Sequence, residues 1–271
     1  MPLQIKGRVI KNGRIKPLYF ILGIDCPPIA DQIRPGQFVM LKVSGNTFPL
    51  LRRPFSVYKS YPTTHPEKKK RGHLIILYKE VGKGTREMAA LSKGQEVDLI
   101  GPLGNGFTLP PLPFSANTIL VGGGVGIASL HSLAVALKGR KVFVFIGGRT
   151  INDVLGADDF KKLDYTIFTA TEDGSLGFHG TVVDLLTSQK KLFEGSEGSH
   201  IYACGPISML KALAKGLNPE EVMCQVSLEA RMGCGFGACW GCVVKTKHSK
   251  MRFQRVCQEG PVFRLEDLDW K

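Results

Sequence analysis

The sequence TILVGGGVGIASLHSLAVAL, residues 118–137, changes its pattern twice. It opens on an apolar run, Thr118–Val121, that is typical of a buried strand, and its last part, residues 127–137, has apolar positions at helical spacing. Between these parts lie the glycines Gly122, Gly123, Gly124 and Gly126. Because these glycines and His131 interrupt the apolar stretch, a strand, a glycine loop and a helix are favoured over a membrane span.

The alternation of strand and helix continues on the C-terminal side of this segment. Lys141–Ile146 has the composition of a further strand. Beyond it, expected strands and helices alternate over Tyr165–Thr169, Thr181–Thr187, Ile201–Ala203 and Ile207–Ala214. This alternation predicts an α/β domain with a parallel sheet and crossover helices, which we place at residues 113–220.

On the N-terminal side the pattern is that of a β domain. Short segments rich in Val, Ile, Leu and Phe are separated by Gly and Pro, and they lie at Gln4–Ile10, Leu18–Ile24, Gln37–Val43, Phe55–Lys59, His73–Lys79 and Glu96–Ile100. Such closely spaced short strands predict a small antiparallel β-barrel over residues 1–112, interrupted by one helix at Thr85–Leu91. Pro110-Pro111-Leu112-Pro113 is then the linker between the two domains.

Four of the seven cysteines lie close together near the C-terminus, with the spacing Cys234-x4-Cys239-x2-Cys242 and then Cys257 after fourteen residues. Plant-type [2Fe–2S] sites use C-x4-C-x2-C followed by a distant fourth cysteine. The intervening residues 235–238 include two glycines, which permit a close wrap, positive φ angles and backbone N–H groups directed at sulfur. Residues 221–271 are therefore expected to form an iron–sulfur module that is too short for a core of its own.

Three other interpretations of these cysteines remain open. Structural zinc also uses four thiolates, but zinc ribbons usually contain two C-x2-C pairs and this sequence has one. A redox pair of Cys239 and Cys242 would leave Cys234 and Cys257 without a role. Chance clustering is the third, since Cys is a small apolar residue that is common in cores. Iron–sulfur ligation is favoured because it accounts for all four cysteines.

Two motifs of the β domain suit a flavin nucleotide. Arg52-Arg53-Pro54-Phe55-Ser56 begins a strand, where a guanidinium can bind a pyrophosphate, an aromatic ring can cover an isoalloxazine and a hydroxyl can hydrogen-bond a ring nitrogen. Gly82-Lys83-Gly84-Thr85 precedes the expected helix and offers backbone N–H groups to phosphates. Each motif also has an ordinary structural explanation: a surface arginine pair beside a core Phe, and a helix capped by Thr85.

The glycine turn at Gly122–Gly126 is a candidate nucleotide site, because it follows a strand and precedes a helix. It does not fit G-x-G-x-x-G, and the next strand ends on Gly147-Gly148-Arg149-Thr150 without an acidic residue. A different mode of nucleotide binding and a turn that only packs helix on strand are both open. Cys204-Gly205-Pro206 forms a second strand-to-helix turn, which could face a nicotinamide or be structural.

The chain carries 36 basic and 23 acidic residues, a formal net charge of +13. Its one tight basic run, Lys68–Arg71, lies in an expected loop at Tyr61–Arg71 without a familiar nucleic-acid-binding motif, so a solvated hairpin tip is favoured and no nucleic-acid partner is expected. Residues 1–20 scatter basic residues among apolar ones, unlike a signal peptide. Together with the seven cysteines, this predicts a reducing compartment, the cytoplasm.

The order of barrel, Arg-x-x-Ser, glycine turn and Cys-Gly-Pro-x-x-Met resembles the ferredoxin-reductase superfamily over residues 1–215. The C-terminal stretches SLEARMGCGFGACWGCVVK (227–245) and VCQEGPVF (256–263) are more specific. They resemble the electron-transfer subunits of NAD-dependent dihydroorotate dehydrogenase B, and this resemblance covers the whole chain.

The resemblance implies FAD on the β domain, NAD on the α/β domain and [2Fe–2S] in the tail. By position, it implies that FAD is bound by Arg53, Pro54, Phe55, Ser56, Leu77, Tyr78, Lys79, Gly84 and Thr85. It implies likewise that the cluster is ligated by Cys234, Cys239, Cys242 and Cys257. The usual motif has Tyr at the position of Phe55, so a hydroxyl contact is lost while ring stacking can remain.

The implied reaction is electron transfer. An FMN-containing dihydroorotate dehydrogenase catalytic subunit would oxidise dihydroorotate, and electrons would pass through the cluster and FAD to NAD+ in a heterotetramer with two of each subunit. This route needs no general acid or base from this chain, so no catalytic residue is expected. NADP stays open because Arg149 could meet a 2′-phosphate. Two other functions also stay open, a reductase that supplies ferredoxin or sulfur-type partners and a zinc-bearing flavoprotein.

Overall fold

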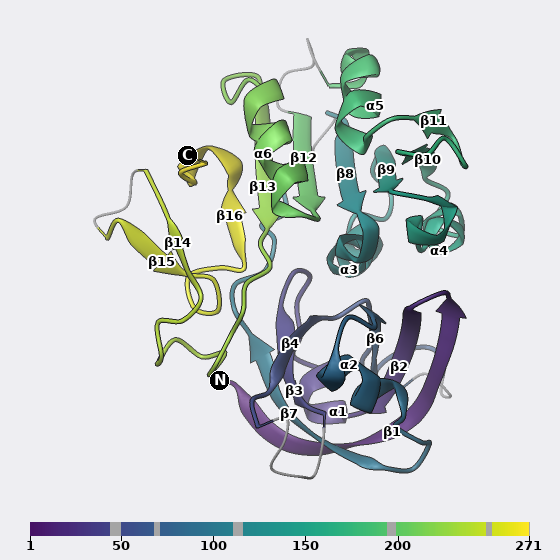
Figure 1. Cartoon of the computed structure of the whole chain (residues 1–271), viewed down its shortest axis with the longest axis vertical. Helices are drawn as coiled ribbons and strands as arrows, with labels where there is room; N and C mark the ends of the chain where they lie inside the picture. Colours follow the sequence, from purple (N-terminus) through teal and green to yellow (C-terminus); the bar gives the residue numbers. More distant parts are fainter. Residues whose placement is uncertain (44–49, 68–70, 111–115, 194–198, 248–250, 271) are drawn as a thin grey trace.

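The computed structural model describes residues 1–43, 50–67, 71–110, 116–193, 199–247 and 251–270. Figure 1 shows three parts: a curved β domain in purple and blue, an α/β domain in teal and green, and a tail in yellow-green and yellow. Lys68–Lys70 of the basic run lie outside the described residues. The same holds for the expected linker from Pro111 onward.

The N-terminal sheet is antiparallel, with seven strands in the order β4-β3-β7-β1-β2-β6-β5. The strands are β1 (Leu3–Lys16), β2 (Tyr19–Asp25), β3 (Phe38–Lys42), β4 (Arg53–Ser56), β5 (Lys59–Tyr61), β6 (His73–Lys79) and β7 (Glu96–Leu103). Along β7 every second residue is buried, the pattern of a strand with one face on a core. The sheet curls into a half-barrel (Figure 1), which confirms the predicted antiparallel β domain.

Three local expectations for this domain need correction. The segment Phe55–Lys59 is divided between β4 and β5. The Gly- and Pro-containing stretch between the expected strands Leu18–Ile24 and Gln37–Val43 is not only a loop: Pro27 begins the short helix α1 (Pro27–Ala30), because proline is well accommodated in a first helical turn. Helix α2 (Lys83–Ala89) starts two residues earlier than expected, with Gly82 as its N-cap.

The second sheet has the order β11-β10-β9-β8-β12-β13-β16, and all its pairs are parallel except β13 with β16. Its strands are β8 (Thr118–Gly123), β9 (Val142–Gly148), β10 (Thr166–Thr171), β11 (Phe178–His179), β12 (Ser199–Cys204), β13 (Val222–Ser227) and β16 (Val262–Arg264). The helices are α3 (Ala128–Ala136), α4 (Ala157–Lys161), α5 (Val182–Ser188) and α6 (Ile207–Gly216). The predicted α/β domain with a parallel sheet is therefore confirmed.

The strand order reverses between β8 and β12. From β8 the chain adds β9 and β10 on one side, and it then returns to add β12 and β13 on the other. At such a switch point the loops that follow the two central strands turn in opposite directions and leave a crevice. This topology places the glycine turn after β8 beside the Cys204–Pro206 turn after β12.

Helices α3 and α4 pack on one face of the parallel sheet, and α5 and α6 pack on the other. In Figure 1, α3 lies between the sheet and the half-barrel. The half-barrel contributes Tyr19, Tyr58 and Leu77 to the core around α3 and α4. The two domains therefore share buried apolar contacts across their boundary. Within the described ranges, no helix has both the length and the apolar character needed to cross a bilayer.

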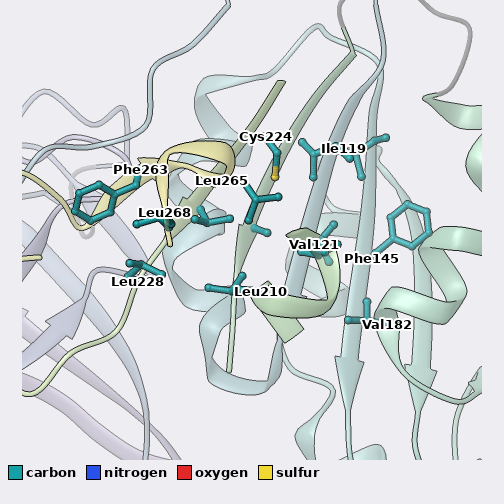
Figure 2. Close-up of a cluster of buried hydrophobic side chains, with 14 of the residues drawn as sticks. Ile119, Val121, Phe145, Val182, Leu210, Cys224, Leu228, Phe263, Leu265 and Leu268 are labelled. Carbon is teal, nitrogen blue, oxygen red and sulfur yellow. The ribbon is translucent and has the colours of Figure 1, made fainter. Parts of the chain in front are cut away.

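The tail completes the second sheet and packs on it. Strand β13 lies beyond residue 220, where the sequence placed the start of the tail, yet it pairs in parallel with β12. Phe263, Leu265 and Leu268 of the tail belong to the same hydrophobic cluster as the sheet strands, as Figure 2 shows. The tail thus has no separate core, as expected from its length. The remaining strands β14 (Val243–Lys245) and β15 (Phe253–Arg255) form a ribbon beside it.

Two tyrosines of the half-barrel fix its position against the α/β domain. Tyr58 donates a 2.6 Å hydrogen bond to Asp159, which also pairs with Lys59 at 2.7 Å. Tyr19 donates to Asp153 in the same way, and Lys79 lies 3.3 Å from that carboxylate. Because these bonds and the shared core act together, the relative placement of the two domains is set by specific contacts.

The buried His131 of α3 gives this interface a pH dependence. Burial, and to a smaller extent Lys59, lower the pKa of His131 to about 4. The unfolded chain therefore binds this proton first as pH falls, so stability should fall between roughly pH 6.5 and the folded pKa. His131→Leu should flatten that part of the pH profile of the thermal unfolding midpoint, whereas His179→Gln, at an exposed position, should not. Equal profiles for wild type and His131→Leu would contradict this assignment.

Candidate functional site

Two of the four clustered cysteines come together through the pairing of β14 with β15. Cys242 directly precedes β14 and Cys257 follows β15 by two residues, and the register Val243↔Arg255 places the two cysteines side by side. The Cys257 N–H points at the Cys242 sulfur, 3.4 Å away. Cys234 and Cys239 lie on the preceding loop, where the Cys239 side chain is hydrogen-bonded to Cys234. The thiols are thus arranged as two neighbouring pairs.

The loop that carries Cys234 and Cys239 has the backbone expected of a wrap around sulfur. Gly235 and Gly237 have φ angles of +84° and +89°, and Trp240 also lies in the left-handed region at +57°. The Gly237 N–H donates to the Cys257 sulfur at 3.2 Å. The expectation of positive φ angles and of N–H groups directed at sulfur is therefore confirmed.

The surroundings of Cys234, at the start of the loop, favour the thiolate form of its side chain. Burial by itself would raise the pKa of the Cys234 thiol, but N–H groups of Cys239, Phe236 and Ala238 lower this pKa to about 6. Burial and the adjacent Cys242 thiol raise the pKa of Cys257 to about 12. A metal that binds Cys257 must therefore displace a proton from it.

The arrangement of the four thiols bears on whether the site suits a single zinc ion or a cluster of two irons. A tetrahedral zinc site needs all four thiolates around one centre. A [2Fe–2S] cluster shares four cysteines between two irons, which suits two pairs with N–H donors at sulfur. The residues present therefore fit the cluster better than structural zinc.

A first pocket, of about 480 Å³, opens between the half-barrel and the chain after β13. Its walls include most of the residues proposed for FAD, namely Arg53, Pro54, Phe55, Ser56, Leu77, Tyr78, Lys79 and Thr85. They come from β4, β6 and α2, which the antiparallel sheet brings together although they are up to thirty-two residues apart in sequence. Phe55 and Tyr78 meet edge to face at 6.1 Å between ring centroids.

Gly84 is absent from the pocket wall but supports it. A Cβ atom on Gly84 would overlap the Arg53 guanidinium, so glycine allows this side chain to lie against the start of α2. Thr85 is not the N-cap of this helix: its hydroxyl instead accepts bonds from Val81 N at 2.8 Å and Gly82 N at 3.0 Å. The turn before α2 is therefore held closed beside the arginine.

Sequence reasoning missed one wall of this pocket, residues Ser227–Met232. These residues directly follow β13, and the carboxyl ends of parallel strands meet at one edge of a sheet. Val222–Ser227 is a short apolar segment of the kind that predicts a strand. The division of the sequence at residue 220 places this segment in the tail, although it belongs to the parallel sheet. Met232 lies only two residues before Cys234, so the wall of the pocket continues directly into the cysteine loop.

A second pocket, of about 590 Å³, lies at the switch point between β8 and β12. Gly123, Gly124, Gly126, Gly205 and Pro206 line it, together with Gly147–Arg149 at the end of β9 and Glu172 after β10. Gly122 and Cys204, also proposed for the nucleotide, do not line it; both are buried behind the turn. A Cβ on Gly126 would lie 2.5 Å from the Cys204 carbonyl oxygen, so this glycine allows the two turns to touch.

The two pockets adjoin. Their linings share Lys79, Val81, Val125 and Glu229. Glu229 lines both pockets, and partial removal of its carboxyl from solvent raises the pKa of that group. Among the residues that line either pocket there is no histidine, and His131 and His200 are buried elsewhere. Two groups that occupy the two pockets would therefore meet directly at this wall.

Two family models match the chain. Residues 229–269 match the iron–sulfur cluster binding domain of dihydroorotate dehydrogenase B, and residues 120–215 match the oxidoreductase NAD-binding domain. The first covers all four clustered cysteines, and the second covers the sheet region that forms the switch-point pocket.

Similar proteins extend over the whole chain. The dihydroorotate dehydrogenase B (NAD(+)) electron transfer subunit of Desulforamulus reducens is 38% identical over 268 residues, 98% of each chain. That of Bacillus caldolyticus is 40% identical over 242 residues, 89% of this chain and 88% of the relative. A solved structure of an NADH-dependent reduced ferredoxin–NADP oxidoreductase is 30% identical, with a TM-score of 0.83 over 97% of this chain and 90% of the other. Plasmodium falciparum ferredoxin–NADP+ reductase, 14% identical with a TM-score of 0.63 over 82% and 96%, shares the fold.

Proposed function

Because the chain belongs to the family of dihydroorotate dehydrogenase B (NAD+) electron transfer subunits, we propose that it connects a dihydroorotate-oxidising partner to NAD+. The partner is an FMN-containing catalytic subunit, and electrons reach NAD+ by way of a [2Fe–2S] cluster and FAD. The observation that carries this proposal is the continuity of the three sites: two pockets share a wall, and the wall of one leads within two residues into the cysteine loop.

Arg53, Pro54, Phe55 and Ser56 are proposed to hold FAD with Leu77, Tyr78, Lys79, Gly84 and Thr85. The support is that all but Gly84 line one pocket and that Gly84 makes room for Arg53. Arg53 offers a planar set of donors that suits a pyrophosphate. Phe55 offers an aromatic surface for the ring system. When bound, FAD converts between one-electron and two-electron transfer, which NAD+ and the cluster require of an intermediary.

The NAD site is proposed at the switch-point pocket. Gly123, Gly124, Gly126, Gly205 and Pro206 bring backbone close to the nucleotide, while Gly122 and Cys204 support the two turns from behind. Lys79, Val125 and Glu229 stand where this pocket meets the flavin pocket, which supports direct transfer between the nicotinamide and the flavin.

A Gly126→Ala substitution tests this site. The added methyl would press on the backbone of Cys204 and Gly205, at 2.5–2.7 Å, so the turn after β12 must move. We expect KM for NADH to rise about tenfold, equivalent to about 1.4 kcal/mol of lost binding, with FAD content unchanged. Gly216→Ala, in the same domain with open space around its Cβ position, is the matched control. Steady-state kinetics with a dye acceptor measure both; an unchanged KM for Gly126→Ala would remove this turn from the site.

Cys234, Cys239, Cys242 and Cys257 are proposed as the ligands of the cluster, in the two pairs described above. We assign the half-barrel (residues 1–112) to FAD, the α/β domain (113–220) to NAD and the tail (221–271) to the cluster, with β13 of the tail built into the NAD-binding sheet. No residue of this chain is proposed as a general acid or base.

The partner is proposed to dock over the cysteine loop. Cys239 is exposed there, and Phe236 and Trp240 beside it are 50% and 46% exposed, which gives an apolar surface next to the cluster. The assembly is a heterotetramer with two copies of each subunit. A cytoplasmic location is supported by the seven free thiols, since thiols stay reduced in such a compartment.

The decisive experiment is anaerobic purification of this chain together with its FMN subunit, followed by quantitation of iron, sulfide, FAD and FMN. We expect a brown complex with two irons and two sulfides per copy of this chain that reduces NAD+ with dihydroorotate. A complex that instead exchanges electrons between NAD(P)H and ferredoxin, without dihydroorotate activity, would support the related reductases, to which the 30% identical solved structure also points. Stoichiometric zinc without iron would reject the proposal.

A further inference from the structure

One arginine outside the ligand set contacts the cysteine loop at two points. Arg255 ends β15, two residues before Cys257. Its Nη1 donates to the Gly237 carbonyl at 2.8 Å, and its guanidinium lies over the Trp240 ring, 4.6 Å from the centroid. Gly237 lies between Cys234 and Cys239, and Trp240 lies between Cys239 and Cys242. One side chain therefore holds both halves of the loop.

The same guanidinium is bound to an acidic partner on the other side of Cys257. Arg255 Nε donates to the Glu259 carboxylate at 3.1 Å, and a second guanidinium nitrogen pairs with the other carboxylate oxygen. Glu259 also accepts a 2.6 Å bond from the Arg255 backbone N–H. The side chains of Arg255 and Glu259 are only 21% and 29% exposed, so this two-point contact is partly shielded from solvent. The turn that carries Cys257 is enclosed between them.

We propose that Arg255 and Glu259 act on the reduction potential of the cluster in opposite directions and balance each other, with Arg255 also a positioning residue that ties the cysteine loop to the Cys257 turn. This inference rests on the proposed cluster. A reduced cluster carries one more negative charge than an oxidised one, so a fixed positive charge beside the thiolates stabilises the reduced form and a fixed negative charge opposes it.

Removal of the positive charge and removal of the negative charge should shift the reduction potential of the cluster in opposite directions. Arg255→Gln should shift the one-electron reduction equilibrium about tenfold toward the oxidised cluster, which is about 59 mV to lower potential. Glu259→Gln should shift it by a similar factor toward the reduced cluster. The double variant should return close to wild type. A purely structural role would not reverse sign between the two single substitutions.

Arg255→Lys separates charge from geometry. Lysine keeps the positive charge but lacks the planar fork that reaches Gly237 and Glu259 together. The reduction equilibrium of its cluster should stay within about threefold of wild type, which is a shift of at most about 28 mV in potential. Its iron should be lost faster to a chelator. Arg264→Gln is the matched control, since it removes the same charge from the same module at β16, where Arg264 pairs with Glu266. It should leave the potential unchanged.

The measurement is a potentiometric titration of the purified complex, followed by electron paramagnetic resonance of the cluster and by iron content. Opposite shifts for Arg255→Gln and Glu259→Gln support the inference. Shifts of the same sign, or none, overturn it while the cluster remains visible. If Arg255→Gln loses its cluster, Glu259→Gln still decides the sign of the charge effect, and a potential in Arg255→Gln that is unmeasurable beside a shift to lower potential in Glu259→Gln overturns the inference. A wild-type complex without a cluster spectrum would instead refute the proposed function.

Discussion

The Cys239→Ser subunit should be purified yellow instead of brown, with FAD in place and the cluster lost or unstable. Cys239 is one of the proposed pair with Cys234, and a serine oxygen is a poorer ligand for iron than a thiolate. Dihydroorotate-dependent NAD+ reduction by the complex should fall by about a hundredfold or more, because the one-electron route through the chain is interrupted. NADH oxidation by a dye that takes electrons from the flavin should stay within about twofold of wild type.

The control for this substitution is Cys26→Ser. Cys26 is a buried thiol of the half-barrel that lies before α1, far in the chain from the cysteine loop. Its substitution should leave iron content and both activities intact. If Cys239→Ser lowered the dye activity and the dihydroorotate-linked activity together, the cluster would not lie between the partner and the flavin.

Arg53→Ala should weaken FAD binding by about ten- to a hundredfold, the loss expected when charge-assisted hydrogen bonds worth about 1.5–3 kcal/mol are removed. Arg53 lines the flavin pocket, and Gly84 leaves space for its guanidinium beside α2. Since every electron must pass the flavin, both the dye activity and the dihydroorotate-linked activity should fall with FAD occupancy. The measurement is the FAD-to-protein ratio after dialysis, with activity recovered by added FAD.

Arg52→Ala is the control on the same strand entry. Arg52 pairs with Asp98 at 2.8 Å and does not line the pocket, so its loss should cost some stability without loss of FAD. Equal FAD content in Arg53→Ala and wild type would show that the pyrophosphate is held elsewhere.

Local patterns in the sequence were sufficient to predict both domains and four of the seven strands of the parallel sheet, but not β11, β13 or β16. The run TILVGGGVG contains a buried strand and the glycines of its turn within nine residues, and the cysteine spacing identifies an iron–sulfur loop without any tertiary information. The flavin motif at Arg53–Ser56 could also be predicted, because successive side chains of a strand alternate between its two faces. These features depend on neighbours along the chain.

Features that depend on distant neighbours could not be predicted in this way. The pairing of Cys242 with Cys257 follows from the register of β14 with β15. The flavin-pocket wall at Ser227–Met232 follows from the placement of β13 beside β12. The shared wall at Lys79 and Glu229 requires the half-barrel and the α/β domain to be positioned by Tyr19 and Tyr58. Sequence patterns give the parts, and these contacts between parts decide which residues meet.

Phe263, Leu265 and Leu268 have a consequence for how far electrons travel. They anchor the iron-bearing tail in the same hydrophobic cluster as the nucleotide-binding strands, so the tail is not a tethered ferredoxin that swings between donor and acceptor. The distance that electrons cross between the cluster and the flavin is then fixed by the fold. The rate of this step should therefore not depend on solvent viscosity or on the length of a linker. The encounters that can limit turnover are then those of this subunit with the nicotinamide nucleotide and with the partner that delivers the electrons.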